Sequence, residues 1–121
     1  MTVLDASALL AFLQGEAGAD VVEAVLQDDG VCAAVNWSET AQKVRARGAD
    51  WPLARSLLIG YGVAGRTVGQ PDAERAAELW TVGSGLSLGD RLCLAVAERL
   101  GSKALTADRA WPDDDRVVQI R

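Results

Sequence analysis

The residue near the start of the chain that could do chemistry is Asp5, which interrupts the apolar run MTVLDASALLAFL. A carboxylate between two segments that both favour burial costs free energy unless a hydrogen-bond donor or a cation compensates its charge. A helix N-cap would supply donors, because an Asp at this position accepts backbone amide hydrogens from the helix that follows. A bound cation would supply the opposite charge. Asp5 alone does not distinguish these two explanations.

Two more acids stand at comparable places in the chain. Asp108 follows the apolar segment KALTA, where a turn or a helix cap would also explain an aspartate. Asp90 lies three residues after Ser87, the spacing of a capping box, yet it shares a helix face with apolar residues. In open parallel sheets, ligands bind beyond the carboxyl ends of the strands, where Asp5 and Asp108 are expected.

Glu39 has the best purely structural explanation of the four acids. It follows Asn36 at capping-box spacing and precedes Lys43 by four residues, the favourable orientation of a helical ion pair. Together, however, four acids gathered in one cleft would repel one another and raise one another's pKa values. Since the chain contains no histidine, hard carboxylate oxygens favour Mg²⁺ or Mn²⁺ as the compensating charge.

Composition excludes several other kinds of chemistry. Without histidine there is no His-based acid–base pair, no Ser-His-Asp triad and no usual zinc site. Cys32 and Cys93 lie too far apart for a C-x-x-C motif, which argues against a disulfide framework. A net charge of −5 argues against passive binding of nucleic acid, although it permits a nuclease whose acids surround metal ions.

The chain also lacks the signals of membrane insertion and export. No apolar stretch approaches the ~18 residues that a membrane span requires. No basic segment followed by an apolar core is present at the N-terminus, so a signal peptide is not expected. We therefore expect a cytoplasmic protein with no membrane contact.

The length of 121 residues predicts one domain, spanning 1–121, in which helices alternate with short strands. Such alternation is typical of an α/β sandwich around a parallel sheet. GRTVGQP, residues 65–71, is predicted as a strand or a loop. The remaining expected strands span 2–5, 30–34, 102–108 and 116–120. The expected helices span 6–13, 17–28, 35–47, 71–80 and 88–100, with one more following a cap at Asp50.

Four segments, V-L-D-A-S-A-L-L, W-S-E, L-S-L-G-D-R-L-C-L-A-V-A and A-L-T-A-D-R-A-W, occur in an order that resembles the PIN-domain ribonucleases. The greatest similarity is to the VapC-type toxins of type II toxin–antitoxin pairs. The resemblance implies a PIN-like three-layer α/β/α sandwich with a short, mostly parallel sheet. It also implies an acidic pocket that holds Mg²⁺ or Mn²⁺ and hydrolyses RNA, commonly transfer RNA.

Matched position by position, the resemblance places the family's acids on four residues of this sequence. Asp5 and Asp90 are expected to bind the metal directly, whereas Glu39 and Asp108 act through water or position the nucleophile. Hydroxyls that support the pocket fall on Ser7 and Thr106. The candidates for contacts to RNA phosphates are Arg45, Arg47, Arg91 and Arg109, although each is also explained as an ordinary exposed arginine.

The resemblance further implies a VapB-type antitoxin that covers the acidic pocket, and a homodimer. Two alternatives remain open. One is a PIN-like module that has lost catalysis and only binds a partner. The other is a phosphotransfer domain that forms an aspartyl phosphate, although Ser7 replaces the second acid of its usual D-x-D motif.

Overall fold

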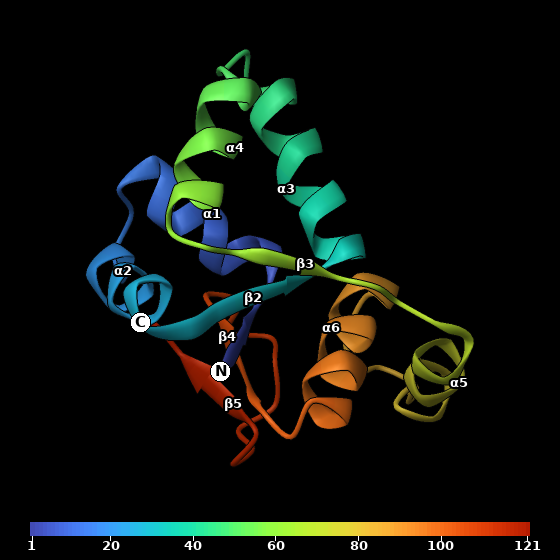
Figure 1. Cartoon of the computed structure of the whole chain (residues 1–121). Helices are drawn as coiled ribbons and strands as arrows, with labels where there is room; N and C mark the ends of the chain where they lie inside the picture. The colour runs from blue at the N-terminus through green and yellow to red at the C-terminus, as the bar shows by residue number, and fades with distance from the viewer.

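The fold is built on a sheet of five parallel strands in the order β3-β2-β1-β4-β5 (Figure 1). The computed structural model describes the backbone of residues 1–121 and all side chains except that of Ala64. All strand pairings described are parallel, which confirms the predicted α/β class and the short, mostly parallel sheet. The strands are β1 (Thr2–Leu4), β2 (Gly30–Ala33), β3 (Ala64–Arg66), β4 (Lys103–Thr106) and β5 (Val117–Gln119).

Helices cover both faces of the sheet, as Figure 1 shows. The first face is covered by α1, α2 and α4, and the second by α6, against which α5 packs. The N-terminus of α3 lies beside α6, and its later turns pack on α1 and α4. The helices are α1 (Ala6–Gln14), α2 (Ala19–Asp29), α3 (Ala34–Ala46), α4 (Trp51–Gly60), α5 (Gln70–Glu78) and α6 (Leu88–Arg99).

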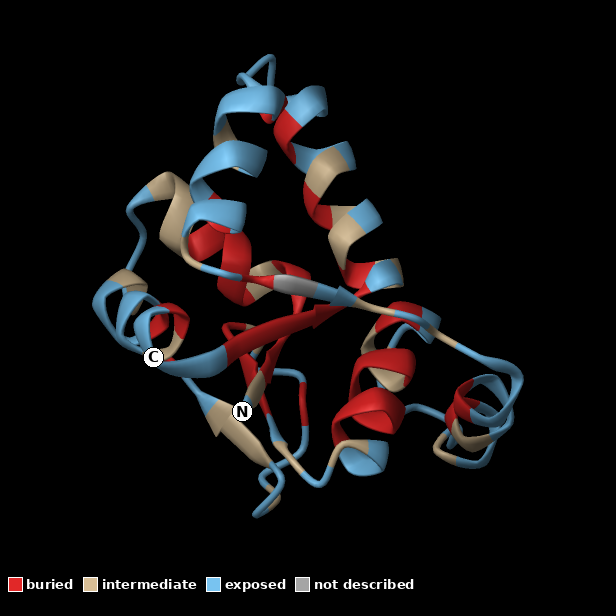
Figure 2. Ribbon diagram, viewed as in Figure 1, coloured by how far each residue is buried: buried red, intermediate tan, exposed pale blue. Residues whose placement is uncertain are grey.

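Alternation along the strands divides the core between the two faces. Leu4 and Cys32 point into the core formed with α1, α2 and α4, whereas Val3 and Val31 point into the core formed with α6. In Figure 2 the buried colour accordingly fills the central strands and the sheet-facing sides of the helices. The predicted three-layer α/β/α sandwich is confirmed.

Most predicted caps are present. Asp5 accepts from the backbone of Ala8 at the start of α1, and Asp50 caps α4 in the same way. Ser87 and Asp90 form the expected capping box of α6. The capping box predicted between Asn36 and Glu39 is wrong: α3 begins at Ala34, directly after β2, so both residues lie inside the helix.

The strand order brings the predicted site residues at the ends of β1 and β4 to one edge of the sheet. The carboxyl ends of β2, β1 and β4 are neighbours, and the chain changes direction across the sheet between β1 and β4. A crevice for ligands forms at such a switch point. Asp5 follows β1 and Thr106 ends β4, so both lie there, while the N-terminal turns of α3 and α6 flank them. None of the helices that the structure describes is long and apolar enough to cross a membrane.

Candidate active site

Asp5 lies at the centre of the site and is 3% exposed. Its Oδ1 accepts from the backbone of Ala8 at 2.8 Å and from Ser7 Oγ at 2.7 Å, and its Oδ2 accepts from Thr106 Oγ1 at 2.6 Å. Burial outweighs these hydrogen bonds and, with a smaller contribution from the negative charge of Asp90, raises the pKa of Asp5 to about 6. Asp5 is therefore both an N-cap and a carboxylate that its surroundings leave short of positive charge.

Two hydroxyls fix the orientation of the Asp5 carboxylate. Ser7 Oγ lies 3.2 Å from Thr106 Oγ1 and accepts from the backbone of Ala107 at 2.9 Å. Thr106, which is fully buried, accepts from the backbone of Asp108 at 3.0 Å. The end of β4 is thus connected to the start of α1 through the predicted supporting residues, Ser7 and Thr106.

Glu39 is held beside the N-terminus of α6. The fully buried Asn36 donates from Nδ2 to Glu39 Oε1 at 2.8 Å and to the Gly89 carbonyl at 3.2 Å. A Cβ at position 89 would lie 2.7 Å from Glu39 Oε2, so a larger residue there would displace the Glu39 carboxylate from its present position. Asn36 therefore connects α3 with α6 and places the Glu39 carboxylate against the backbone next to Asp90.

Asp90 divides its carboxylate between two roles. Its Oδ2 accepts from the backbone of Ser87 at 3.0 Å, and Ser87 Oγ accepts in return from the backbone of Asp90 at 3.1 Å. The residue is half-buried, and its charge reaches Asp5, whose pKa it raises. Asp90 therefore caps α6 and also places negative charge near Asp5.

Two buried thiols, those of Cys32 and Cys93, lie near three of the predicted acids. Burial raises the pKa of Cys32 most, and the charges of Asp5 and Glu39 raise it further. Burial likewise raises the pKa of Cys93, to which Asp5, Asp90 and Glu39 all contribute. Asp5, Glu39 and Asp90 therefore all lie near enough to Cys93 to raise the pKa of its thiol.

Asp108 and the four predicted arginines are not part of the group formed by Asp5, Glu39 and Asp90. Asp108 is half-buried, and its Oδ1 accepts from the backbone of Ala110 at 2.9 Å, closing the turn that the sequence also allowed. Arg91 donates to the Ala76 carbonyl at 2.9 Å and is held against α5. The other three predicted arginines are exposed: Arg45, Arg47 and Arg109.

Comparison with known proteins identifies the family. Residues 2–116 match the PIN domain. The chain belongs to the PIN domain family. This match confirms the family-level resemblance that the sequence segments indicated. A search of curated proteins finds no match.

Solved structures share this PIN-domain fold at low sequence identity. A toxin–antitoxin complex from Klebsiella pneumoniae gives a TM-score of 0.82 at 18% identity, covering 100% of this chain and 98% of that chain. VapC20 of Mycobacterium tuberculosis, named a sarcin–ricin loop cleaving toxin, gives 0.69 at 16% identity, covering 96% and 92%. A protein from Pyrobaculum aerophilum gives 0.61 at 22% identity, covering 90% and 75%.

The donors of this PIN domain suit a hard divalent cation. Asp5, Glu39 and Asp90 offer carboxylate oxygens, and the buried Asn36 Oδ1 has no hydrogen-bond partner within the described part of the chain. Among the residues that the structure describes, no group of three or more acids or thiols is close enough together to hold a metal ion. The chemistry of the oxygen donors suits Mg²⁺ or Mn²⁺, and waters would have to complete the coordination, since Mg²⁺ usually keeps several waters.

Asn36 is the residue of this PIN-domain site that sequence reasoning missed. The sequence does contain a signal, because Asn-x-x-Glu places both side chains on one helical face. That spacing was interpreted as a capping box, whereas β2 leads directly into α3 at Ala34 and both side chains lie inside the helix.

Proposed function

We propose that this chain is a metal-dependent endoribonuclease, the toxin of a type II toxin–antitoxin pair, which hydrolyses tRNA or another structured RNA. The observation that carries the proposal is that Asp5 follows β1 while Asp90, in the first turn of α6, and Glu39, in the second turn of α3, lie near it in a PIN domain. Within the described residues, no lysine or arginine pairs with Asp5. The names of the similar structures, a toxin–antitoxin complex and an RNA-loop-cleaving toxin, support the same proposal.

The side chains have distinct roles in this proposal. Asp5 and Asp90 hold the ion directly, and Glu39 and Asp108 contribute through water. When bound, Mg²⁺ or Mn²⁺ lowers the pKa of a water and neutralises charge on the phosphate. Ser7 and Thr106 keep Asp5 oriented through their hydroxyls.

Glu39 is the proton acceptor that we assign. Asn36 engages Oε1 and leaves Oε2 to receive a proton from the attacking water. The water oxygen then forms a bond to phosphorus, the bond from phosphorus to the leaving ribose oxygen breaks, and that oxygen takes a proton from solvent.

The partners that we propose are a VapB-type antitoxin and a second copy of the chain, acting in the cytoplasm. A groove of about 600 Å³ is lined by Leu13, Val44, Leu53 and Leu57 of α1, α3 and α4. Leu53 is 68% and Leu57 46% exposed, and these neighbouring side chains of α4 form an apolar surface that a partner would cover. Co-purification with the product of an adjacent antitoxin gene, and the mass of the isolated chain in solution, test these two contacts.

The catalytic proposal is tested by cleavage of structured RNA. The native chain is incubated with tRNA and Mg²⁺ or Mn²⁺, with and without EDTA, beside Asp5→Asn and Asp90→Asn. Asp113→Asn is the matched control, because Asp113 is an exposed acid outside the cleft. We expect cleavage by the native chain and the control only, and only without EDTA.

The other outcomes separate the alternatives. Cleavage that survives EDTA or both cleft substitutions contradicts a metal nuclease. No cleavage together with no ion binding favours a module that only binds a partner. Transfer of phosphate to the protein favours the aspartyl-phosphate alternative.

A further inference from the structure

A basic pocket opens close to Asp5. It has a volume of about 350 Å³ and lies between α1 and α3, with the end of the chain on its other side. Ser7 contributes to its wall, and the same Ser7 hydroxyl donates to both oxygens of Asp5. The pocket therefore begins one side chain away from the centre of the candidate active site.

Positive charge dominates the lining. Lys43, Arg47 and Arg121 line the pocket together with one acid, Glu16. Glu16 lies 3.5 Å from Arg121, which also donates to the Ala107 carbonyl at 3.4 Å. Over the part of the chain that the structure describes, Lys43 and Arg47 form no ion pair, although the chain carries a net charge of −5. These two cations are thus available to a ligand at this pocket.

The geometry of α3 extends this charge away from the cleft. Glu39, Lys43 and Arg47 follow one another at four-residue spacing and so lie along one side of the helix. At a rise of about 1.5 Å per residue, Lys43 lies roughly 6 Å and Arg47 roughly 12 Å beyond Glu39 along the axis. If one phosphate of an anionic chain lies at Glu39, the next groups along that chain would therefore lie near Lys43 and then near Arg47.

We propose that this pocket binds backbone phosphates of the RNA strand on one side of the bond that is cut, through Lys43 and Arg47. The inference rests on the proposed function and adds to it the residues that hold the substrate. Arginine and lysine neutralise phosphates without reading sequence, so the pocket positions the strand while the acidic cleft performs the cleavage. It assigns an RNA contact to Arg47, which the sequence also suggested, and to Lys43, which it did not.

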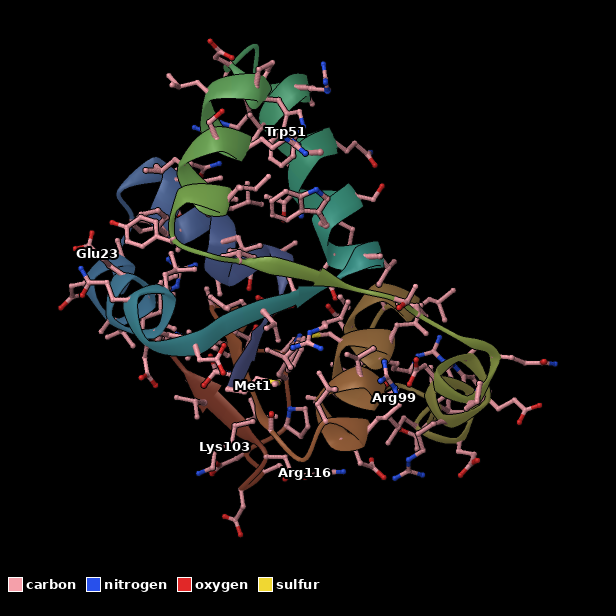
Figure 3. All side chains as sticks on the ribbon, in the orientation of Figure 1. Met1, Glu23, Trp51, Arg99, Lys103 and Arg116 are labelled. Atoms are coloured by element: carbon pink, nitrogen blue, oxygen red, sulfur yellow. The ribbon has the colours of Figure 1, made fainter. Side chains whose placement is uncertain are left out.

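The test compares two double variants of equal charge. Lys43→Gln/Arg47→Gln removes both available cations of the pocket. Arg55→Gln/Lys103→Gln removes two exposed cations elsewhere: Arg55 on α4, and Lys103 at the amino end of β4, which Figure 3 labels. Binding of a fluorescent single-stranded RNA is measured in EDTA by anisotropy over a series of salt concentrations, so cleavage does not interfere.

We expect the pocket variant to bind all RNA sequences more weakly and the control variant to bind like the native chain. The slope of log affinity against log salt should become shallower by about 0.7 for each phosphate that the variant no longer neutralises. Equal slopes in all three proteins, or no RNA binding by the native chain, would overturn the inference. Binding of oligoglutamate that depends on the pocket, without a change in RNA binding, would assign the pocket to an acidic protein segment instead.

Failure of the inference is distinguishable from failure of the proposed function. Metal-dependent cleavage by the native chain with unchanged RNA binding by the pocket variant contradicts only the pocket. Weaker RNA binding by the pocket variant with no cleavage by the native chain contradicts only the nuclease.

Discussion

Two buried aspartates of this chain have opposite surroundings. Asp5 is 3% exposed and Asp72 is 4% exposed, although Asp5 lies deeper among the protein atoms. Asp72 accepts from Arg99 Nε at 2.8 Å and from the backbone of Gly69 at 3.0 Å, and the Arg99 hydrogen bond is the main cause of its lowered pKa. Figure 3 shows Arg99 between α6 and α5.

Asp5 has hydroxyl and amide donors but no described arginine or lysine, and burial raises its pKa. The comparison indicates how the fold treats the two charges. Asp72 is compensated from within the chain and fastens α5 to α6. Asp5 is left for a cation from outside, which is a property of a binding site rather than of a structural contact.

The largest expected effect is on the rate of RNA cleavage, which should depend on Asp5 and not on Asp72. Asp5→Asn should lower RNA cleavage by more than about 100-fold, beyond the 10- to 100-fold typical of a group that only supports a metal ligand. Asp72→Asn should leave the rate per folded molecule unchanged. Initial rates at saturating Mn²⁺ measure both, and a similar decrease in the two variants would contradict the distinction.

The second effect is stabilisation by the ion. An ion that binds only the folded chain should stabilise it by about 2.7 kcal/mol at a concentration 100 times its Kd. The gain should be retained in Asp72→Asn and absent in Asp5→Asn. Thermal unfolding with Mg²⁺, Mn²⁺ or EDTA measures it, and an unchanged Tm of the native chain at millimolar ion would count against the site.

The third effect concerns stability without the ion. Asp72→Asn should lower the free energy of unfolding by about 1–2 kcal/mol, since it weakens a charged hydrogen bond and the capping contact with Gly69, while Arg99 stays partly hydrated. Urea unfolding in EDTA at neutral pH measures this decrease. Glu74→Gln is the control, because Glu74 is an exposed acid on the same helix.

The smallest effect is the pH dependence of the stability difference between the native chain and Asp72→Asn. The folded-state pKa of Asp72 lies below its ordinary value of 3.8, so its stabilisation is present above that value and declines as the pH falls through the folded-state pKa. The difference between native chain and Asp72→Asn should therefore shrink below about pH 4. A difference that stays constant into acid would mean that Asp72 stabilises through packing alone.

The sequence predicts the local elements of this fold well. The alternation of helices and strands, the caps at Asp5 and Asp50, and the Ser87–Asp90 box all follow from short-range spacing. β3 spans Ala64–Arg66 and overlaps only the first two residues of GRTVGQP. The sequence could not decide between strand and loop there, because three residues carry too little periodicity.

Contacts between distant residues could not be predicted in this way. Asp72 and Arg99 are 27 positions apart, and nothing in either segment indicates the other. The link from Asn36 to Gly89 likewise depends on how α3 meets α6. For the site, the rule of strand ends pointed to Asp5 and Asp108, whereas the positions of Glu39 and Asp90 near Asp5 depend on how α3 and α6 pack. The pocket at Lys43 and Arg47 likewise required the packing of α1 on α3.

The two thiols beneath the cleft have a practical consequence. A cysteine must lose its proton to react with an alkylating reagent, and burial makes this unfavourable because it raises the pKa of both Cys32 and Cys93. Each is therefore labelled only when the protein around it opens. Because Cys32 faces α1 and α2 while Cys93 belongs to α6, their labelling rates compare the two sides of the sheet. Equal rates would mean that both layers separate in one event, and unequal rates that one layer loosens before the other.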